Sequence, residues 1–245
     1  MAVKASPIKR ALVSVSNKDG LIDFCSLLVK KYGVEIVSTG GTFDALKKAK
    51  IKCTEVSELT NFPEIMDGRV KTLHPKVHGG ILARRGLDEK VMEENDISPI
   101  DLVVVNLYPF AETIRKKTVS LETAIENIDI GGPSMVRSAA KNNKYVGVVV
   151  DHKDYPLILE EIKNNSGSLS QETRSALATK AFSHTANYDT IISGYLSSLN
   201  EQDFPDHILA KYQKKEDLRY GENPHQKAAF YVDHTKPGNG VGNAI

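Results

Sequence analysis

The chain has 245 residues, which is enough for one large domain or for one domain and part of another. Its 32 basic and 31 acidic residues give a net charge of +1. This balance argues against a general nucleic-acid or anionic-membrane binder, because such proteins need a clear excess of cations. The only cysteines, Cys25 and Cys53, form no metal-type pair and do not indicate an oxidising compartment. No segment is typical of a signal peptide or a membrane span, so we expect a cytosolic protein.

Apolar runs typical of buried strands alternate with helical patterns along the first 150 positions. The expected strands, of which the third is weak, are 11–15, 34–37, 53–56, 102–105 and 146–150. The expected helices begin at Leu21, at about Thr42, after an N-cap at Ser120, and at Pro133 with an end near Lys144. This alternation predicts an α/β fold, with a parallel sheet flanked by helices on both faces. Ligands of such sheets bind beyond the carboxyl ends of the strands.

A long helix is expected from Ser170 to about Leu199. Its apolar stripe also contains His184, which we interpret as a core or interface residue. The chain then becomes polar over 201–215 and loop-like over 237–240. We therefore expect one domain over 1–199, followed by a linker and the beginning of a second domain over 200–245.

Polar segments follow the first two expected strands. Ser16–Gly20 follows the first strand, and the second is followed by Ser38–Thr42, which contains two adjacent glycines. Glycines let the backbone approach a ligand closely, and the amino end of the next helix offers N–H groups and a positive dipole end to a phosphate. A threonine N-cap after a tight turn is the alternative interpretation.

Residues 68–80 combine Arg69, Lys71 and two histidines with three glycines. Pro75 and the glycines argue against a helix, and the lack of alternation argues against a strand. A loop this rich in donors suits an anionic ligand, since an arginine can form paired hydrogen bonds with a phosphate or carboxylate and a lysine supplies a movable charge. A solvated loop is the alternative.

Two further segments carry polar groups. Asn106–Phe110 follows the fourth strand, where Asn106 and Tyr108 either face a ligand or belong to an ordinary Asn/Pro turn. Asp129 precedes a glycine pair and a helix whose Arg137 and Lys141 share one face. That face either continues the ligand site or is simply solvated. The opposite face should pack, and it carries Met135, Val136, Ala139 and Ala140.

No metal-site spacing, nucleophile–histidine arrangement, Walker loop or dinucleotide-binding glycine motif is present in the sequence. What remains is a set of Lys, Arg, Asp, Tyr and hydroxyl groups near helix amino ends. These groups suit a phosphorylated small molecule and acid–base chemistry without a metal or redox cofactor.

Several segments together resemble a known family, the bifunctional AICAR transformylase/IMP cyclohydrolases of purine synthesis. The segments are 16–18, 38–42, 68–75, 106–110, 128–132 and 139–142. The resemblance runs from about Ile8 to Leu199 over the cyclohydrolase domain and resumes over 218–226, which is similar to the opening of the transformylase domain. Members of the family are more than twice as long, so we expect an N-terminal portion that lacks most of the transformylase.

The resemblance implies a methylglyoxal-synthase-like fold and closure of the second purine ring, from formyl-AICAR to IMP with loss of water. It implies no cofactor for this step, 10-formyltetrahydrofolate for the parent's transformylase, and a homodimer without nucleic-acid or membrane partners. The implied catalytic residues are Lys71 for the oxyanion, Asp129 and Lys141 as the acid–base pair, and Tyr108 as a positioning or proton-relay group.

The resemblance also implies a set of substrate-binding residues. They are Ser16, Asn17, Lys18, Thr39, Gly40, Gly41, Thr42, Arg69, Val70, Thr72, Asn106, Ile130, Gly131 and Arg137, while Arg219 and Tyr220 match part of the transformylase substrate site. A non-catalytic nucleotide-binding regulatory domain of the same fold, as in carbamoyl-phosphate synthetases, is the alternative. Joint presence of the four catalytic candidates favours the enzyme, and the 218–226 segment argues against methylglyoxal synthase.

Overall fold

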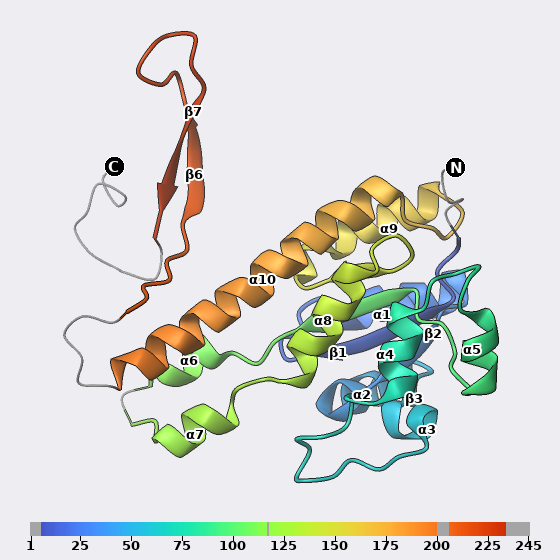
Figure 1. The fold of residues 1–245 in the computed structure, drawn as a ribbon. Helices are drawn as coiled ribbons and strands as arrows, with labels where there is room; N and C mark the ends of the chain where they lie inside the picture. The colour runs from blue at the N-terminus through green and yellow to red at the C-terminus, as the bar shows by residue number, and fades with distance from the viewer. Residues whose placement is uncertain (1–5, 117, 200–205, 234–245) are drawn as a thin grey trace. The chain divides into compact units, whose positions relative to one another are not determined.

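The computed structural model describes residues 6–116, 118–199 and 206–233 (Figure 1). Within it the chain forms two compact units, Met1–Ala186 and Asn187–Ile245. The division falls inside one long helix, α10 (Gln171–Ser198), which begins in the first unit. The expectation that one domain ends at Leu199 and a second begins after it stays a prediction.

The first unit contains a parallel sheet in the order β3-β2-β1-β4-β5. The strands are β1 (Arg10–Val15), β2 (Glu35–Ser38), β3 (Thr54–Glu55), β4 (Leu102–Asn106) and β5 (Gly147–Val149). Each corresponds to an expected strand, so the predicted parallel α/β sheet is confirmed. The central strands are apolar on both faces because helices cover both of them; Leu12 and Val103, which are paired in register, are both fully buried.

Helices connect and cover these strands (Figure 1). They are α1 (Leu21–Tyr32), α2 (Gly40–Lys48), α3 (Val56–Thr60), α4 (Pro75–Leu82), α5 (Glu89–Glu94), α6 (Phe110–Ile114), α7 (Leu121–Glu126), α8 (Gly131–Lys141), η1 (His152–Asp154) and α9 (Tyr155–Asn164). Helix α8 packs on β4, β5 and α4 through the predicted apolar face, whose four members are all buried. Phe24 of α1 stacks on Tyr155 of α9 with ring centroids 4.2 Å apart.

The direction of the strand order reverses at β1, which lies between β2 and β4. Because parallel crossovers are right-handed, the connections that run out to β3 and those that run out to β5 cover opposite faces of the sheet. A crevice therefore opens where β1 and β4 end, and this switch point is where open α/β sheets bind ligands.

The prediction that residues 68–80 are not helical is wrong for the second half of this segment. Residues Pro75–Leu82 form α4, with Pro75 at the first position, where a missing N–H costs nothing. His74 caps this helix, since its Nδ1 accepts a hydrogen bond from the Lys76 amide at 3.1 Å. Gly79 and Gly80 lie inside the helix because it packs closely on 97–100: a Cβ on Gly80 would lie 2.5 Å from the Ser98 carbonyl oxygen.

Other helix boundaries also differ from expectation. Helix α8 begins at Gly131, two positions before Pro133, and ends at Lys141. Helix α2 begins at Gly40 and not at about Thr42, with Thr39 at its N-cap position. Ser120 caps α7 as predicted, since its hydroxyl accepts from the Thr123 amide at 3.1 Å. The long helix is confirmed as α10, where His184 is half-buried.

The described part of the second unit contains an antiparallel hairpin, β6 (Gln213–Leu218) and β7 (Ala228–Val232), with an irregularity between Lys214 and Glu216. Strand β6 overlaps the end of the expected polar linker 201–215, and its side chains are all exposed. The predicted loop 237–240 lies outside the described residues. Among the helices that are described, none is long and apolar enough to cross a membrane.

Gly80→Ala should lower the free energy of unfolding by about 1–3 kcal/mol, because the new methyl group meets a backbone oxygen that cannot move cheaply. Gly194→Ala is the matched control, since nothing lies within 4 Å of a Cβ at that helical position. Urea denaturation followed by circular dichroism should show the control as neutral or as stabilised by up to about 1 kcal/mol. Equal effects of the two substitutions would contradict the proposed close packing of α4.

Candidate functional site

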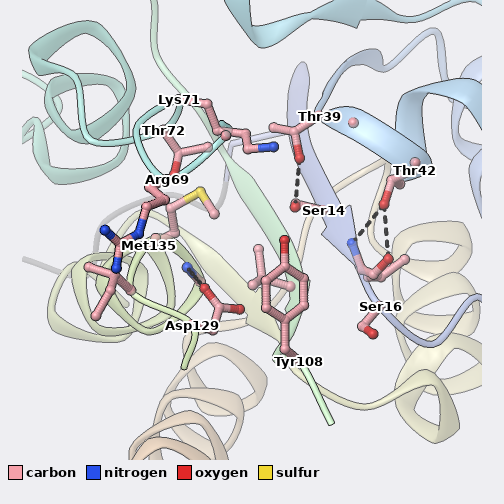
Figure 2. A pocket seen from close by; sticks show the side chains of 18 of the residues that line it. Ser14, Ser16, Thr39, Thr42, Arg69, Lys71, Thr72, Tyr108, Asp129 and Met135 are labelled. Atoms are coloured by element: carbon pink, nitrogen blue, oxygen red, sulfur yellow. Dashed lines mark hydrogen bonds between the residues drawn. The ribbon is translucent and has the colours of Figure 1, made fainter. Parts of the chain in front are cut away.

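A cavity of about 630 Å³ lies at the predicted position, beyond the carboxyl ends of β1, β2 and β4 (Figure 2). Its other walls come from the loop before α4 and from the α7–α8 connection. The predicted site residues that line it are Ser16, Lys18, Thr39, Gly40, Gly41, Thr42, Arg69, Lys71, Thr72, Asn106, Tyr108, Asp129, Ile130 and Gly131. The fold therefore brings together residues from five separate sequence motifs.

Two hydroxyl contacts fix the start of α2 against the end of β1. Ser14 Oγ and Thr39 Oγ1 are hydrogen-bonded at 2.8 Å (Figure 2). Thr42 Oγ1 accepts from the Val15 amide at 2.9 Å and donates to the Val15 carbonyl at 3.0 Å. The buried Thr42 hydroxyl thus holds the start of α2 against β1, and the predicted role of Thr42 in substrate binding stays a prediction.

Two lysine ammonium groups lie close to the amino end of α2. Gly40 has a φ of +44°, a conformation that favours glycine. The Nζ atom of Lys71 lies 3.7 Å from where a Cβ on Gly40 would be, and the Nζ atom of Lys18 lies 4.0 Å from the equivalent point on Gly41. Two ammonium groups and a helix amino end together form a site for an anion.

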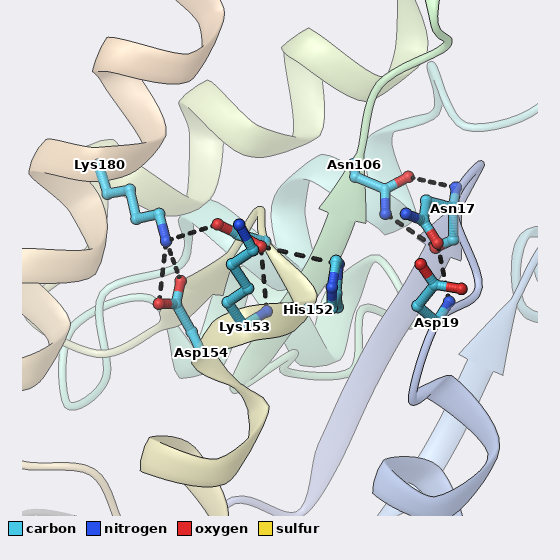
Figure 3. A network of polar contacts seen from close by, with 8 residues as sticks. Asn17, Asp19, Asn106, His152, Lys153, Asp154 and Lys180 are labelled. Atoms are coloured by element: carbon cyan, nitrogen blue, oxygen red, sulfur yellow. Dashed lines mark hydrogen bonds and ion pairs between the residues drawn. The ribbon is translucent and has the colours of Figure 1, made fainter. Parts of the chain in front are cut away.

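Asn106 organises the loop that carries Lys18 (Figure 3). Its Oδ1 accepts from the amides of Ser16 at 2.6 Å and Asn17 at 3.1 Å, and its Nδ2 donates to the Asn17 carbonyl at 2.9 Å. The Asn17 side chain accepts from the Asp19 amide and does not line the cavity. Both asparagines were predicted to bind substrate, but the structure engages both amides in shaping the β1 loop.

A second polar network follows β5 and fixes the first-unit part of α10 (Figure 3). Lys180 Nζ lies 2.8 Å from Asp154 Oδ2 and 3.0 Å from Asp151 Oδ2. Burial opposes the charge on Lys180, yet hydrogen bonds from its ammonium to Asp154 and Asp151 outweigh this and raise its pKa. This network lies just beyond the carboxyl end of β5 and outside the cavity lining.

Arg69 and Lys71 are placed by a small hairpin. Ile65 and Val70 form an antiparallel bridge, closed by a turn with positive φ at Asp67 (53°) and Gly68 (87°). Arg69 and Lys71 line the cavity, whereas Val70 between them, which was predicted to bind substrate, does not.

Each of these two cations is paired with a carboxylate. Lys71 Nζ lies 3.0 Å from Glu64 Oε2, and Arg69 Nε lies 3.4 Å from Glu126 Oε1. In the Arg69–Glu126 pair both side chains are more than half exposed, so this contact contributes little to stability.

Asp129 lies on the other side of the cavity from the start of α2. Burial raises the pKa of its carboxyl, while hydrogen bonds from the Gly132 and Tyr108 amides and the nearby charge of Lys71 act in the opposite direction. The Gly132 amide donates to Asp129 Oδ1 at 2.8 Å. Tyr108 points its hydroxyl into the space that the Lys71 ammonium also faces (Figure 2). A carboxyl group more readily protonated than usual is suited to exchange protons with a ligand.

The predicted polar face of α8 does not form part of the cavity. Arg137 lies over the Phe182 ring, 5.5 Å from its centroid, and Ser138 contacts Nδ1 of His78 at 3.0 Å. Lys141 ends the 11-residue helix, about 15 Å along its axis from Gly131, and does not line the cavity. Of α8, Gly131, Gly132 and Met135 line the cavity, and the predicted roles of Arg137 and Lys141 stay predictions.

Sequence reasoning missed several lining residues. They are Ser14, Val15, Asp67, Gly68, Val105, Ile125, Glu126, Ile128, Gly132 and Met135. The Asp67–Gly68 pair is a recognisable hairpin-turn signal that could have identified the hairpin. Glu126 carried no comparable signal, because a glutamate at a helix end is ordinarily solvated.

Within the described ranges, no group of three His, Cys, Asp or Glu side chains is placed to hold a metal ion. Arg219 and Tyr220 follow β6 in the second unit, and both are exposed. The predicted partial transformylase site at these two residues stays a prediction.

Comparison with known proteins identifies the family. Residues 20–134 match the family described as MGS-like domain, and residues 139–244 match the family described as AICARFT/IMPCHase bienzyme. A crystal structure of ForH superposes with a TM-score of 0.69 at 33% identity, covering 77% of this chain and 99% of that one. The bifunctional purine biosynthesis protein PurH of Thermoanaerobacter sp. (strain X514) is 57% identical over 230 residues. The chain belongs to the PurH-like family.

The aligned region covers 93% of this chain but only 45% of the PurH protein, so the chain spans about half the length of that relative. The MGS-like match covers the cavity-lining residues from Thr39 to Gly132, while Ser14, Val15, Ser16, Lys18 and Met135 lie outside it. The AICARFT/IMPCHase match covers the end of α8, β5, α9, α10 and the hairpin.

Asp129→Asn tests the environment of this carboxyl. Because burial raises the pKa of Asp129 in the folded state, the free energy of unfolding should fall as the pH rises from the ordinary carboxyl pKa through the folded one. Asparagine keeps an oxygen acceptor for the Gly132 amide but cannot ionise. Urea titrations across pH should therefore show the variant gaining stability relative to the wild type as the pH rises, and then a constant difference. A difference that is independent of pH would contradict the assignment.

Proposed function

We propose that the chain is an IMP cyclohydrolase that closes the second ring of formyl-AICAR to give IMP and water, without a cofactor. The observation that carries the proposal is the cavity itself, with an anion site at one side and a proton-exchanging carboxyl at the other. A nucleotide substrate combines a phosphate with a reacting base, and it therefore needs both. Family membership supports this choice over other phosphorylated ligands.

The 5′-phosphate would bind at the amino end of α2. Lys18, together with the backbone amides of Gly40 and Gly41, would hold it there, since a helix amino end and an ammonium group both favour negative charge. The base would then extend toward Tyr108 and Asp129, which lie across the cavity.

The reaction forms one carbon–nitrogen bond and breaks one carbon–oxygen bond. The carboxamide nitrogen attacks the formyl carbon, and the formyl oxygen becomes an oxyanion. The carboxamide nitrogen loses one proton and the formylated amino nitrogen loses another, and both leave with the former formyl oxygen as water, so no electron donor or acceptor is needed. An enzyme must therefore stabilise the oxyanion and move protons from nitrogen to oxygen.

The cavity offers groups for these steps. The Lys71 ammonium would lie against the developing oxyanion, Asp129 would exchange the protons, and Tyr108 would orient the base or relay a proton. Lys141 is left out of the proposed acid–base pair, because its position at the end of α8 does not place it in this chain's cavity.

The activities and assembly of the longer relatives are a separate matter. The formyl transfer with 10-formyltetrahydrofolate belongs, in our proposal, to the whole protein and requires segments beyond those of this chain. A cytosolic homodimer is proposed on the same grounds of family membership.

Lys71→Ala should reduce the rate of IMP formation from formyl-AICAR at least about 100-fold, because one charge that contacts a developing oxyanion often contributes this much. The assay follows IMP by chromatography, with no folate added. Lys48→Ala, which removes an exposed lysine at the end of α2, is the matched control and should retain wild-type turnover. Tight nucleotide binding by the wild type without any turnover would instead favour a regulatory binding domain.

The chain should not transfer a formyl group from 10-formyltetrahydrofolate to AICAR. Arg219 and Tyr220 supply only part of the implied transformylase site, and they lie in an exposed turn after β6. Formyl-AICAR production is measured with IMP formation in the same preparation as a positive control. Formylated product above the protein-free background would refute this expectation.

A further inference from the structure

Glu64 belongs to a second, smaller cavity of about 260 Å³ beside the main one. This side cavity is lined by Gly40, Glu55, Val56, Ser57, Phe62, Pro63, Glu64 and Lys71. Only Gly40 and Lys71 also line the main cavity. Lys71 therefore forms part of the wall between the two spaces, and its ion-pair partner Glu64 lies on the side away from the proposed substrate.

The charges around Lys71 explain why a carboxylate is needed there. Its ammonium lies at the amino end of α2, close to Gly40, and the Lys18 ammonium lies close to the next residue of the same helix. Two cations at a positive helix end repel each other and the helix dipole. Glu64, at 3.0 Å from Lys71, offsets this repulsion while the anion site holds no ligand.

Gly68, in the turn of the hairpin, lies against this ion pair. A Cβ on Gly68 would lie 2.5 Å from Glu64 Oε1 and 3.4 Å from Lys71 Nζ. The φ of +87° at Gly68 favours glycine, and a Cβ at this position would require the Glu64 carboxylate to shift. Since 22% of the Lys71 side chain and 46% of that of Glu64 are exposed, water screens the pair and it can exchange.

We propose that Glu64 is an internal counter-ion that competes with the anionic nucleotide for Lys71. This inference rests on the proposed function, because it takes Lys71 to contact the substrate. Glu64 is then a positioning residue: it holds the ammonium at the cavity wall before binding and gives it up when the nucleotide arrives. The competition weakens nucleotide binding, and the same competition assists release of the product.

Glu64→Gln distinguishes competition from simple support of the loop. The variant keeps the size and a hydrogen-bonding oxygen but removes the charge that competes. The dissociation constant for IMP, measured by isothermal titration calorimetry, should fall by about two- to fivefold, as expected for a partly screened ion pair. The gain should shrink in concentrated salt, which screens the charges. Loss of a merely structural contact would instead weaken binding.

Two controls define the origin of the effect. Glu35→Gln removes a similar surface carboxylate, which pairs with Arg10. Both residues lie at the amino ends of their strands, away from the cavity, so this variant should leave the affinity for IMP unchanged. In a Lys71→Ala background, Glu64→Gln should produce no tightening, because the group for which the two anions compete is gone.

The outcomes separate this inference from the proposed function. If the wild-type chain does not bind IMP, the proposed function fails and this inference fails with it. If the wild type binds IMP and Glu64→Gln binds it equally or more weakly, only the inference is overturned. Tightening that persists without Lys71 also overturns it, since the effect would then not pass through that ammonium.

Discussion

The structure depends on a concentration of positive charge at the amino end of α2. The Ser14–Thr39 and Thr42–Val15 hydrogen bonds fix this helix end against β1. Lys18 and Lys71 then converge on its first two residues from separate loops. Like charges are brought together here at a cost that only an anion, or a neighbouring carboxylate, offsets. This cluster of charges is therefore explained by ligand binding and not by a contribution to the stability of the fold.

The rest of the site is arranged around that charge. Asn106 shapes the loop that carries Lys18, and the 65–70 hairpin presents Arg69 and Lys71 from the opposite wall. The connection into α8 places Asp129 where burial keeps its carboxyl more readily protonated than usual. An anion held at α2 thus leaves the remainder of a nucleotide facing a proton-exchanging group. Topology makes this possible, since the switch point at β1 brings the ends of three strands to one crevice.

The sequence predicts the sheet well because strands buried on both faces carry a strong apolar signal, as in 102–105 and 146–150. It fails at α4, where Pro75 suggests a break but occupies the first helical position, and where Gly80 serves packing. Motifs at strand ends indicated one part of the cavity, and the glycine-containing segments 68–75 and 128–132 indicated another. The sequence could not show that Val70 in the hairpin and Lys141 at the end of α8 lie outside the cavity lining. The role of Glu64 could not be predicted from the sequence, because it depends only on the contact of this side chain with Lys71.

The most direct test of this account is a crystal structure of the chain with bound IMP. The account predicts the phosphate against the Gly40 and Gly41 amides, within hydrogen-bonding distance of Lys18, and the base between Lys71, Tyr108 and Asp129. It also predicts that Lys71 has left Glu64 for the nucleotide. A phosphate bound elsewhere, for example at Arg69 with the amino end of α2 still unoccupied, would contradict the central claim that this charge cluster is the nucleotide's anion site.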